Sequence, residues 1–304
     1  MRSSRETSYG PWLVALGAAL WGTESAWRIP LNDVFAPDVI VWWEHVLLVA
    51  LALPFILPRL GELRRVSNRA IAWLVFSGIA GSAVGTVFFT LALKHGNPTV
   101  VNVVLNIQPV LSTTAACLLF GDKLGRGFFP WAALAVAAGA VISIADLGDL
   151  TGVDAGTGYA LICALFWGMS TVAARGVMVE MSLPLASGLR LVVGLISMTI
   201  IIGARGLISS GDLWTAAAAA APAKTIGALV GLATLSGGIP LVIYFAGLAR
   251  TRASTAGYFE MMQTLAGATI TWVFFHHALE RHQVYAGIVL IVAVAMVQRA
   301  QSRT

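Results

Sequence analysis

Long apolar runs separated by short polar gaps dominate the chain. A bilayer core about 30 Å thick needs about 20 apolar residues for each spanning helix. Runs of that length predict ten transmembrane helices, at residues 11–31, 38–57, 70–93, 98–120, 129–146, 157–178, 184–204, 223–248, 253–275 and 283–299. The pattern therefore predicts an all-α polytopic membrane protein.

Part of the chain also occurs twice. Residues 96–124, GNPTVVNVVLNIQPVLSTTAACLLFGDKL, align without a gap with residues 251–279, TRASTAGYFEMMQTLAGATITWVFFHHAL, which places Gln108 on Gln263. Internal repeats indicate a duplicated unit. We therefore expect a first five-helix repeat at 1–150 and a second at 151–304.

The number of helices in each repeat has a geometric consequence. Five spans return the chain on the opposite side of the membrane, so the second repeat must be inserted upside down relative to the first. Inverted repeats place a binding site near the bilayer midplane and permit alternating access. This arrangement is typical of transporters.

Composition supports the membrane class. The chain is 58% apolar and 11% charged, too little charge to cover a soluble domain of 304 residues. The net charge of +5 does not indicate nucleic-acid binding, because the basic residues lie mostly in short gaps between apolar runs. Cys117 and Cys163 each lie inside an apolar run, so no disulfide framework or zinc site is expected. The first run carries Glu24 and Arg28 and is too long for a secretory signal, so we expect it to be an uncleaved helix.

The distribution of Lys and Arg predicts the orientation. With a cytoplasmic N-terminus, twelve of the nineteen basic residues fall on the inner side: Arg2, Arg5, Arg59, Arg64, Arg65, Arg69, Lys123, Arg126, Arg250, Arg252, Arg299 and Arg303. The outer connection 147–156 holds Asp149 and Asp154 and no base. We expect a multi-pass protein of the cytoplasmic membrane with both termini in the cytoplasm.

Several motifs carry a resemblance to a known family. They are QPVLSTTAACLLFGDKL near the end of the first repeat, LFWG in the sixth predicted helix and ALWG in the first. With these motifs the chain resembles the EamA-type permeases of the drug/metabolite transporter superfamily, from about Gly10 to Gln298. The sequence departs from the family's Gly-Glu pair, with Gly121-Asp122 in the first repeat and His276-His277 in the second, and has Thr264 where proline is common.

The resemblance implies a fold and an activity. It implies ten helices, cytoplasmic termini, and a central cavity lined by the first, third, fourth, sixth, eighth and ninth helices. Export of small metabolites, often amino acids, is the common activity of the family.

Polar residues inside the predicted helices are the first site candidates, since each costs about 2.5–3.5 kcal/mol at a helix centre. Glu24 and Arg28 are four residues apart and share a helix face with Trp21. Glu44 lies at a depth similar to that of Arg28 and could meet it. These residues predict either a structural ion pair of Arg28 with a glutamate, or contact of Glu24 with substrate or a proton.

A second charged set lies nearer the inner side. Arg190 and Glu260 are predicted at matched depth, which suggests an ion pair, and Arg190 aligns with Glu44 across the repeats. Arg190 is therefore interpreted as structural. Glu260 aligns with Leu105, so the architecture does not require a carboxylate there. A buried carboxylate can carry a proton, and Glu260 is a candidate for proton coupling as well as for an ion pair.

Amides and aromatic residues complete the predicted site. Asn102 and Asn106 present two amides on one face, for substrate binding or for helix packing. Gln263 follows Glu260 by one turn and is a cavity candidate, whereas Gln108 precedes Pro109 and is assigned to a bend or to packing. The aromatic candidates for the wall of the cavity are Trp21, Trp167, Tyr244 and Tyr258.

A helix break is predicted at Gly237, Gly238 and Pro240, because glycine relaxes the backbone and proline removes a donor. Such a break can expose backbone groups to a substrate, or be a kink without a ligand. The His-rich stretch 276–282 lies in an outer connection and is interpreted as surface histidines rather than a metal site. No GxSxG or GxxxxGK[ST] pattern occurs, so a catalytic elbow and an ATP-binding loop are not indicated, and no cofactor or metal is expected.

The sequence thus predicts a secondary transporter that exports small polar or zwitterionic metabolites, such as amino acids, with possible coupling to a proton gradient. Its expected partners are the small-molecule substrate and the lipid bilayer, and it is a monomer or a homodimer. A channel or a non-transporting membrane receptor is the alternative. An intramembrane enzyme is a remote one, since no nucleophile and base converge at one depth.

Overall fold

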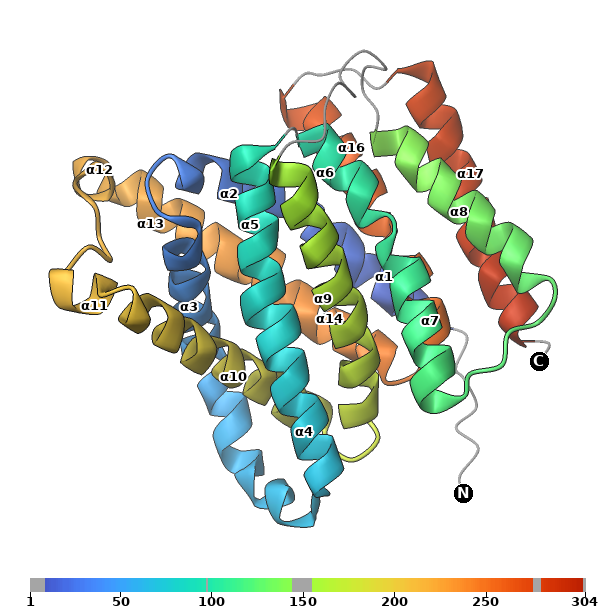
Figure 1. The fold of residues 1–304 in the computed structure, drawn as a ribbon, viewed down its shortest axis with the longest axis horizontal. Helices are drawn as coiled ribbons and strands as arrows, with labels where there is room; N and C mark the ends of the chain where they lie inside the picture. Colours follow the sequence, from blue (N-terminus) through green and yellow to red (C-terminus); the bar gives the residue numbers. More distant parts are fainter. Residues whose placement is uncertain (1–8, 97, 144–154, 276–279, 303–304) are drawn as a thin grey trace.

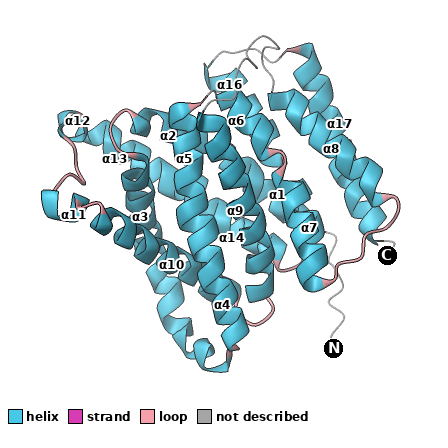
Figure 2. Ribbon diagram, in the orientation of Figure 1, coloured by secondary structure: helices cyan, strands magenta, loops and turns pink. Residues whose placement is uncertain are grey.

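The computed structural model describes residues 9–96, 98–143, 155–275 and 280–302. Within these ranges every regular element is helical and no strand occurs (Figure 2), as predicted. The helices lie side by side as one bundle in which segments from the two halves of the chain alternate (Figure 1).

The first half forms α1 (Gly10–Trp21), α2 (Glu24–Asn32), α3 (Pro37–Ile56), the 3₁₀ segment η1 (Leu57–Arg65), α4 (Asn68–Ser77), the π-helical segment η2 (Gly78–Val84), α5 (Gly85–His95), α6 (Pro98–Leu105), α7 (Gln108–Phe120) and α8 (Phe128–Ser143). Several starts are set by proline, as at Pro11 and Pro37, where the missing N–H has no partner to lose. Ser67 caps α4 by accepting a hydrogen bond from the Ala70 N–H. Gly121 ends α7 with a left-handed φ of 67°.

The second half forms α9 (Ala155–Val177), α10 (Leu183–Ala204), α11 (Leu207–Ser210), α12 (Ala216–Ala220), α13 (Pro222–Gly231), the π-helical segment η4 (Leu232–Gly238), α14 (Ile239–Leu248), α15 (Ala253–Glu260), α16 (Met262–Phe275) and α17 (Arg281–Ser302). The short helix α12 lies in the run of alanines that precedes Pro222.

Several of the predicted helices are interrupted. Two residues, Gly22 and Thr23, separate α1 from α2, residues 106–107 separate α6 from α7, and Met261 separates α15 from α16. The predicted break at Gly237, Gly238 and Pro240 has the form of the π-helical segment η4, which continues directly into α14. A matching π-helical segment, η2, lies between α4 and α5.

Five helical stretches in the described part of the chain are long and apolar enough to cross a membrane: Pro37–Arg65, Asn68–His95, Ala155–Val177, Leu183–Ala204 and Pro222–Leu248. Helices also occupy the other five predicted ranges. Three of those ranges are divided by the interruptions at 22–23, 106–107 and 261, which leaves shorter pieces. Large apolar side chains such as Leu118 and Ile200 lie on the outside, as expected for a surface that faces lipid.

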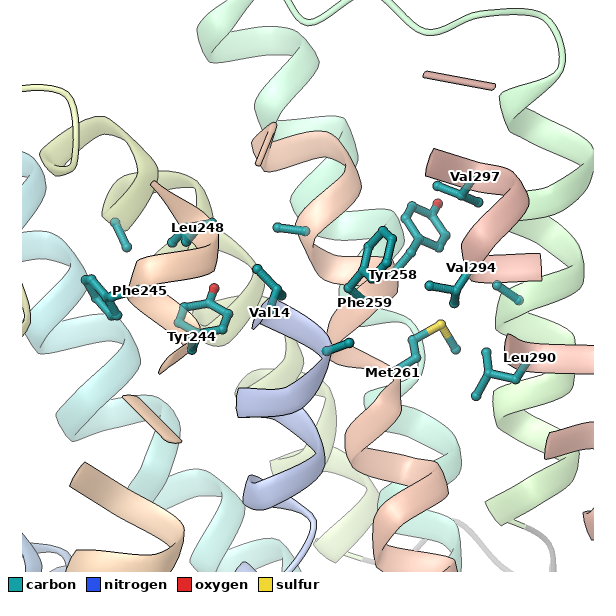
Figure 3. Packing of buried hydrophobic residues seen from close by; sticks show 14 of the residues in the cluster. Val14, Tyr244, Phe245, Leu248, Tyr258, Phe259, Met261, Leu290, Val294 and Val297 are labelled. Atoms are coloured by element: carbon teal, nitrogen blue, oxygen red, sulfur yellow. The ribbon is translucent and has the colours of Figure 1, made fainter. Parts of the chain in front are cut away.

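Helices from the first half pack against helices from the second. The pairs are α3 with α10, α8 with α17, α7 with α15, α1 with α14, and α9 with α4 and α5. The largest apolar cluster joins both halves. Figure 3 shows part of it, where Val14 of α1, Tyr244 of α14, Phe259 of α15 and Leu290 of α17 contribute side chains.

Candidate functional site

A cavity with both polar and apolar walls lies between the two halves of the chain. Its lining comes from helices of both halves: Trp21, Glu24, Arg28, Glu44, His45, Leu48, Gly81, Ser82, Thr86, Gln108, Trp167, Ser170, Thr171, Arg190, Leu191, Ser236, Gly237, Leu241, Tyr244 and Gln263. The lining therefore includes α3 and α10, the second and seventh predicted helices, in addition to the six that the resemblance implied. The extra helices matter because they contribute Glu44 and Arg190.

One wall of the cavity holds a fully buried arginine between two carboxylates. Arg28 forms ion pairs with Glu24, one turn before it on α2, and with Glu44 of α3, where Nη2 and Oε2 are 2.6 Å apart. Its Nη1 donates to Thr90 Oγ1 at 3.2 Å. Both contacts suggested by sequence spacing and depth are present. Two carboxylates around one guanidinium leave this cluster with one more formal negative charge than positive.

Arg190 of α10 lies in a different environment. Its Nε donates to Ser82 Oγ at 2.9 Å, and its guanidinium carbon lies 5.4 Å from the centre of the Phe245 ring. The expected ion pair with Glu260 is absent, and no other described carboxylate lies within 4.0 Å of Arg190. This prediction was wrong because depth along a helix does not fix the direction in which a side chain points.

Glu260 is held by neutral donors instead. Its Oε1 accepts from Tyr244 Oη at 2.7 Å and from Thr171 Oγ1 at 3.1 Å, and its Oε2 accepts from Gln108 Nε2 at 2.5 Å. These four residues come from α14, α9, α7 and α15, so the carboxylate joins helices of both halves. Gln108 was assigned from sequence to a bend or to helix packing; it bonds Glu260 of α15 and also lines the cavity.

A second, smaller cavity adjoins the first and shares Gln108, Trp167 and Gln263 with it. Asn102, Asn106 and Glu260 line this second cavity. Asn106 Nδ2 donates to the Asn102 carbonyl at 2.8 Å, and Thr264 Oγ1 donates to Asn106 Oδ1 at 3.2 Å. The two asparagines thus lie together, separated from the central cavity by the shared wall.

The two π-helical segments bring polar groups to the central cavity. Gly81 and Ser82 lie on η2, and Ser236 and Gly237 lie on η4. The widened backbone leaves the Gly81 carbonyl for a bond from Trp167 Nε1 at 3.2 Å, while Ser236 Oγ lies 2.7 Å from Thr23 Oγ1 at the break between α1 and α2. Of the predicted break, Gly237 lines the cavity.

The aromatic candidates divide into two groups. Trp21 and Tyr244 line the central cavity, with their ring centres 4.7 Å apart. Trp167 lines both cavities, and its ring centre lies 5.1 Å from that of Phe89. Tyr258 instead lies in the apolar cluster, against the Phe128 ring at 5.4 Å, and lines neither of these two cavities (Figure 3).

Sequence reasoning missed several cavity residues: Gln108, Thr171, Ser170, Ser82, Ser236, Thr86 and His45. Most are small hydroxyl residues, which are common inside apolar helices and carry no distinctive spacing. One sequence feature could have indicated two of them. Ser82 and Ser236 occupy equivalent positions in the two repeats, in the π-helical segments η2 and η4.

The described residues contain no group of three or more His, Cys, Asp or Glu side chains that could hold a metal ion. His276 and His277 lie outside the described residues, and His282 is exposed on α17.

Comparisons with known proteins agree with this architecture. The model of the EamA-like transporter family matches residues 8–145 and again residues 155–299. A curated protein named riboflavin transporter ImpX, from Fusobacterium nucleatum subsp. nucleatum, is 24% identical over 305 residues, which cover 95% of this chain and 97% of that protein. A solved crystal structure covers 98% of this chain and 99% of its own with a TM-score of 0.72 at 18% identity, which shows a shared fold.

Proposed function

The chain belongs to the EamA-like transporter family, and from this premise we propose that it is a secondary transporter that exports small polar or zwitterionic metabolites, with amino acids as the leading class. It works in the cytoplasmic membrane with both termini in the cytoplasm. The observation that carries the substrate class is the central cavity, whose charged groups belong to two separate sets, Glu24–Arg28–Glu44 and Arg190.

The architecture that we propose is ten membrane spans in two inverted repeats, 1–150 and 151–304. The helix pairing supports it, because exchanging helices for their counterparts turns the pair α1 with α14 into the observed pair α9 with α5, and the pair α7 with α9 into the observed pair α16 with α1. The π-helical segments of the third and eighth spans and the two matches of the family model support it as well.

Alternating access follows from this architecture. When two inverted halves exchange their conformations, a cavity between them opens first to one side of the membrane and then to the other. Helices of both halves line the cavity, and the break between α1 and α2 and the π-helical segments η2 and η4 provide points of bending.

The cavity's lining suits small zwitterions. Trp21, Tyr244 and Trp167 supply apolar walls beside the charged groups. The relative named as a riboflavin transporter makes riboflavin the second candidate, since the two chains match over nearly their full lengths. Amino acids and riboflavin are therefore both tested in the transport assay described below.

We propose further that Glu260 couples transport to the proton gradient, with Glu24 as the second candidate. Glu260 is buried, contacts no cation at salt-bridge distance among the described residues, and bonds three neutral donors from α7, α9 and α14. Protonation would remove the charge that these donors stabilise and would weaken the link between four helices. A proton at this position thereby favours one state of the transporter over the other.

Counterflow tests the proposal. Purified protein in proteoliposomes preloaded with unlabelled amino acid should accumulate the labelled compound transiently, which a channel cannot do. With Glu260→Gln, exchange should persist while uphill transport driven by a pH gradient is lost. Unchanged pH-driven transport in Glu260→Gln would contradict the role of Glu260, and absence of counterflow for amino acids and riboflavin would contradict the proposed function.

A further inference from the structure

No described carboxylate forms an ion pair with Arg190 within 4.0 Å, although Glu260 is near enough to interact with its charge electrostatically. Each of the three buried carboxylates near the cavities already has its partners: Glu24 and Glu44 bond Arg28, and Glu260 bonds neutral donors. His45 lines the same cavity, but histidine adds no negative charge in any protonation state. A buried guanidinium without a directly paired counter-ion is costly, and an anion that binds beside it lowers that cost.

The position of Arg190 is fixed by packing. Ser82 Oγ accepts from Nε, which leaves the two terminal nitrogens without a bond to a described carboxylate. The Phe245 ring supports the guanidinium by a cation–π contact at 5.4 Å. Gly81 leaves the space for it, because a Cβ on Gly81 would lie 2.4 Å from Arg190 Nη2 and 2.0 Å from Ser170 Oγ.

The geometry points to Arg190 as the binding site for the carboxylate of the transported metabolite, with Ser82 and Gly81 as the residues that position it. This inference rests on the proposed function and deepens it. The planar guanidinium matches a carboxylate with two parallel N–H bonds. The Glu24–Arg28–Glu44 cluster on α2 and α3 has an excess of one formal negative charge, and in this assignment it faces the ammonium group of the substrate.

Binding measured by thermal shift tests this assignment, since a ligand of the folded state raises the melting temperature. The probes are glycine, serine, leucine, phenylalanine and tryptophan, each beside its C-terminal amide and its deaminated acid. The amide lacks the carboxylate and should give no shift. The deaminated acid keeps the carboxylate and lacks the ammonium group. If the substrate is an amino acid, the deaminated acid should bind more weakly than the amino acid; if the substrate is an organic acid, it should bind at least as well.

Arg190→Gln is the principal variant and should weaken binding of the amino acids by about tenfold or more, the scale of a charge-assisted hydrogen bond. Arg190→Lys keeps the charge but not the paired N–H geometry and should retain part of the affinity. Ser82→Ala and Gly81→Ala disturb the position of Arg190 and should weaken binding without removing its charge. Arg250→Gln, which removes an exposed guanidinium outside the cavity, is the matched control and should bind as the wild type does.

The result that overturns the assignment is equal stabilisation by acids and amides, or an undiminished shift in a folded Arg190→Gln variant. Absence of any shift with all the amino acids and deaminated acids also overturns it. Counterflow measured in parallel separates this outcome from failure of the proposed function. If the wild type transports a solute whose binding is unchanged in the Arg190 variants, the proposed function is retained and the assignment of Arg190 as a carboxylate site is rejected.

Discussion

Arg28 and Arg190 are both placed inside the helix bundle, yet their surroundings differ. Arg28 is 0% exposed and bonds two carboxylates and a threonine hydroxyl. Arg190 lines the cavity with a serine and an aromatic ring as its neighbours. Removing Arg28 would leave two buried carboxylates without their cation, whereas removing Arg190 would break no ion pair with a described carboxylate. The two arginines therefore predict different consequences of mutation.

Arg28→Met should destabilise the protein strongly. Glu24 and Glu44 would then face each other without a cation, and breaking a buried ion pair on one side costs about 3–5 kcal/mol. The melting temperature of the purified variant in detergent measures the effect. Glu24→Gln is the matched control and should cost less, because Arg28 keeps Glu44 and Thr90. An Arg28→Met variant that melts with the wild type would contradict a structural role for this cluster.

Residue-scale prediction from sequence succeeded where local geometry decides the contact. Glu24 and Arg28 lie four apart in one helix, so their pairing follows from helix geometry alone. It failed for Arg190 and Glu260, because rotation about the helix axis and the neutral donors Tyr244 and Thr171 decide where Glu260 points. Those donors lie far away in sequence, and their spacing carries no signal.

At the scale of elements, the interruptions in the helices caused the largest difference between the predicted and the observed site. Gln108 lies about 200° from Asn106 on an ideal helix, which argued against a cavity role. The chain is not helical at residues 106–107, so α7 starts with a new rotation and directs Gln108 to Glu260. Glycine and proline indicated the irregular segment η4, while η2 has no proline and was not predicted.

Two connections of different halves are joined by matching contacts. Glu62 accepts from the Ser182 N–H at 3.1 Å and from its Oγ at 2.8 Å, at the start of α10. Glu180 accepts from the Ser67 N–H at 2.7 Å and from its Oγ at 2.8 Å, at the start of α4. A carboxylate is favourable at a helix N-terminus. These contacts therefore hold η1 and the start of α4 against the connection between α9 and α10.

The Glu180 contact predicts a pH dependence of stability. The bonds from the Ser67 N–H, and then from its hydroxyl, hold the pKa of Glu180 below its ordinary value. The contribution of Glu180 is therefore present above the ordinary pKa and is lost as the pH falls through the lowered one. Glu180→Gln should melt slightly below the wild type at pH 7, and the two melting curves should converge in acid.

The control for this experiment is Asp212→Asn, which removes an exposed carboxylate from the connection between α11 and α12. It should melt like the wild type at both pH values. A difference between Glu180→Gln and the wild type that stays constant into acid would show that charge on Glu180 is not the cause.

At the scale of the molecule, the pairing of helices explains where the cavity lies. Helices of the first half pack with helices of the second in every major pair, so the cavity walls belong to both halves. The hydrophobic pattern could predict which ranges are helical, since burial in lipid dictates length and composition. It could not predict the cavity's contents, because these depend on which faces of distant helices meet.

The central claim is that one cavity between the halves opens to each side of the membrane in turn. The most direct measurement is the reaction of Leu241→Cys, which lies in the cavity lining, with a membrane-impermeant maleimide applied to either face of oriented vesicles. The background carries Cys117→Ser and Cys163→Ala, and Leu118→Cys on the outer apolar surface serves as the unreactive control. The account predicts reaction from both faces, and reaction from one face only, whatever the substrate or pH gradient, would contradict it.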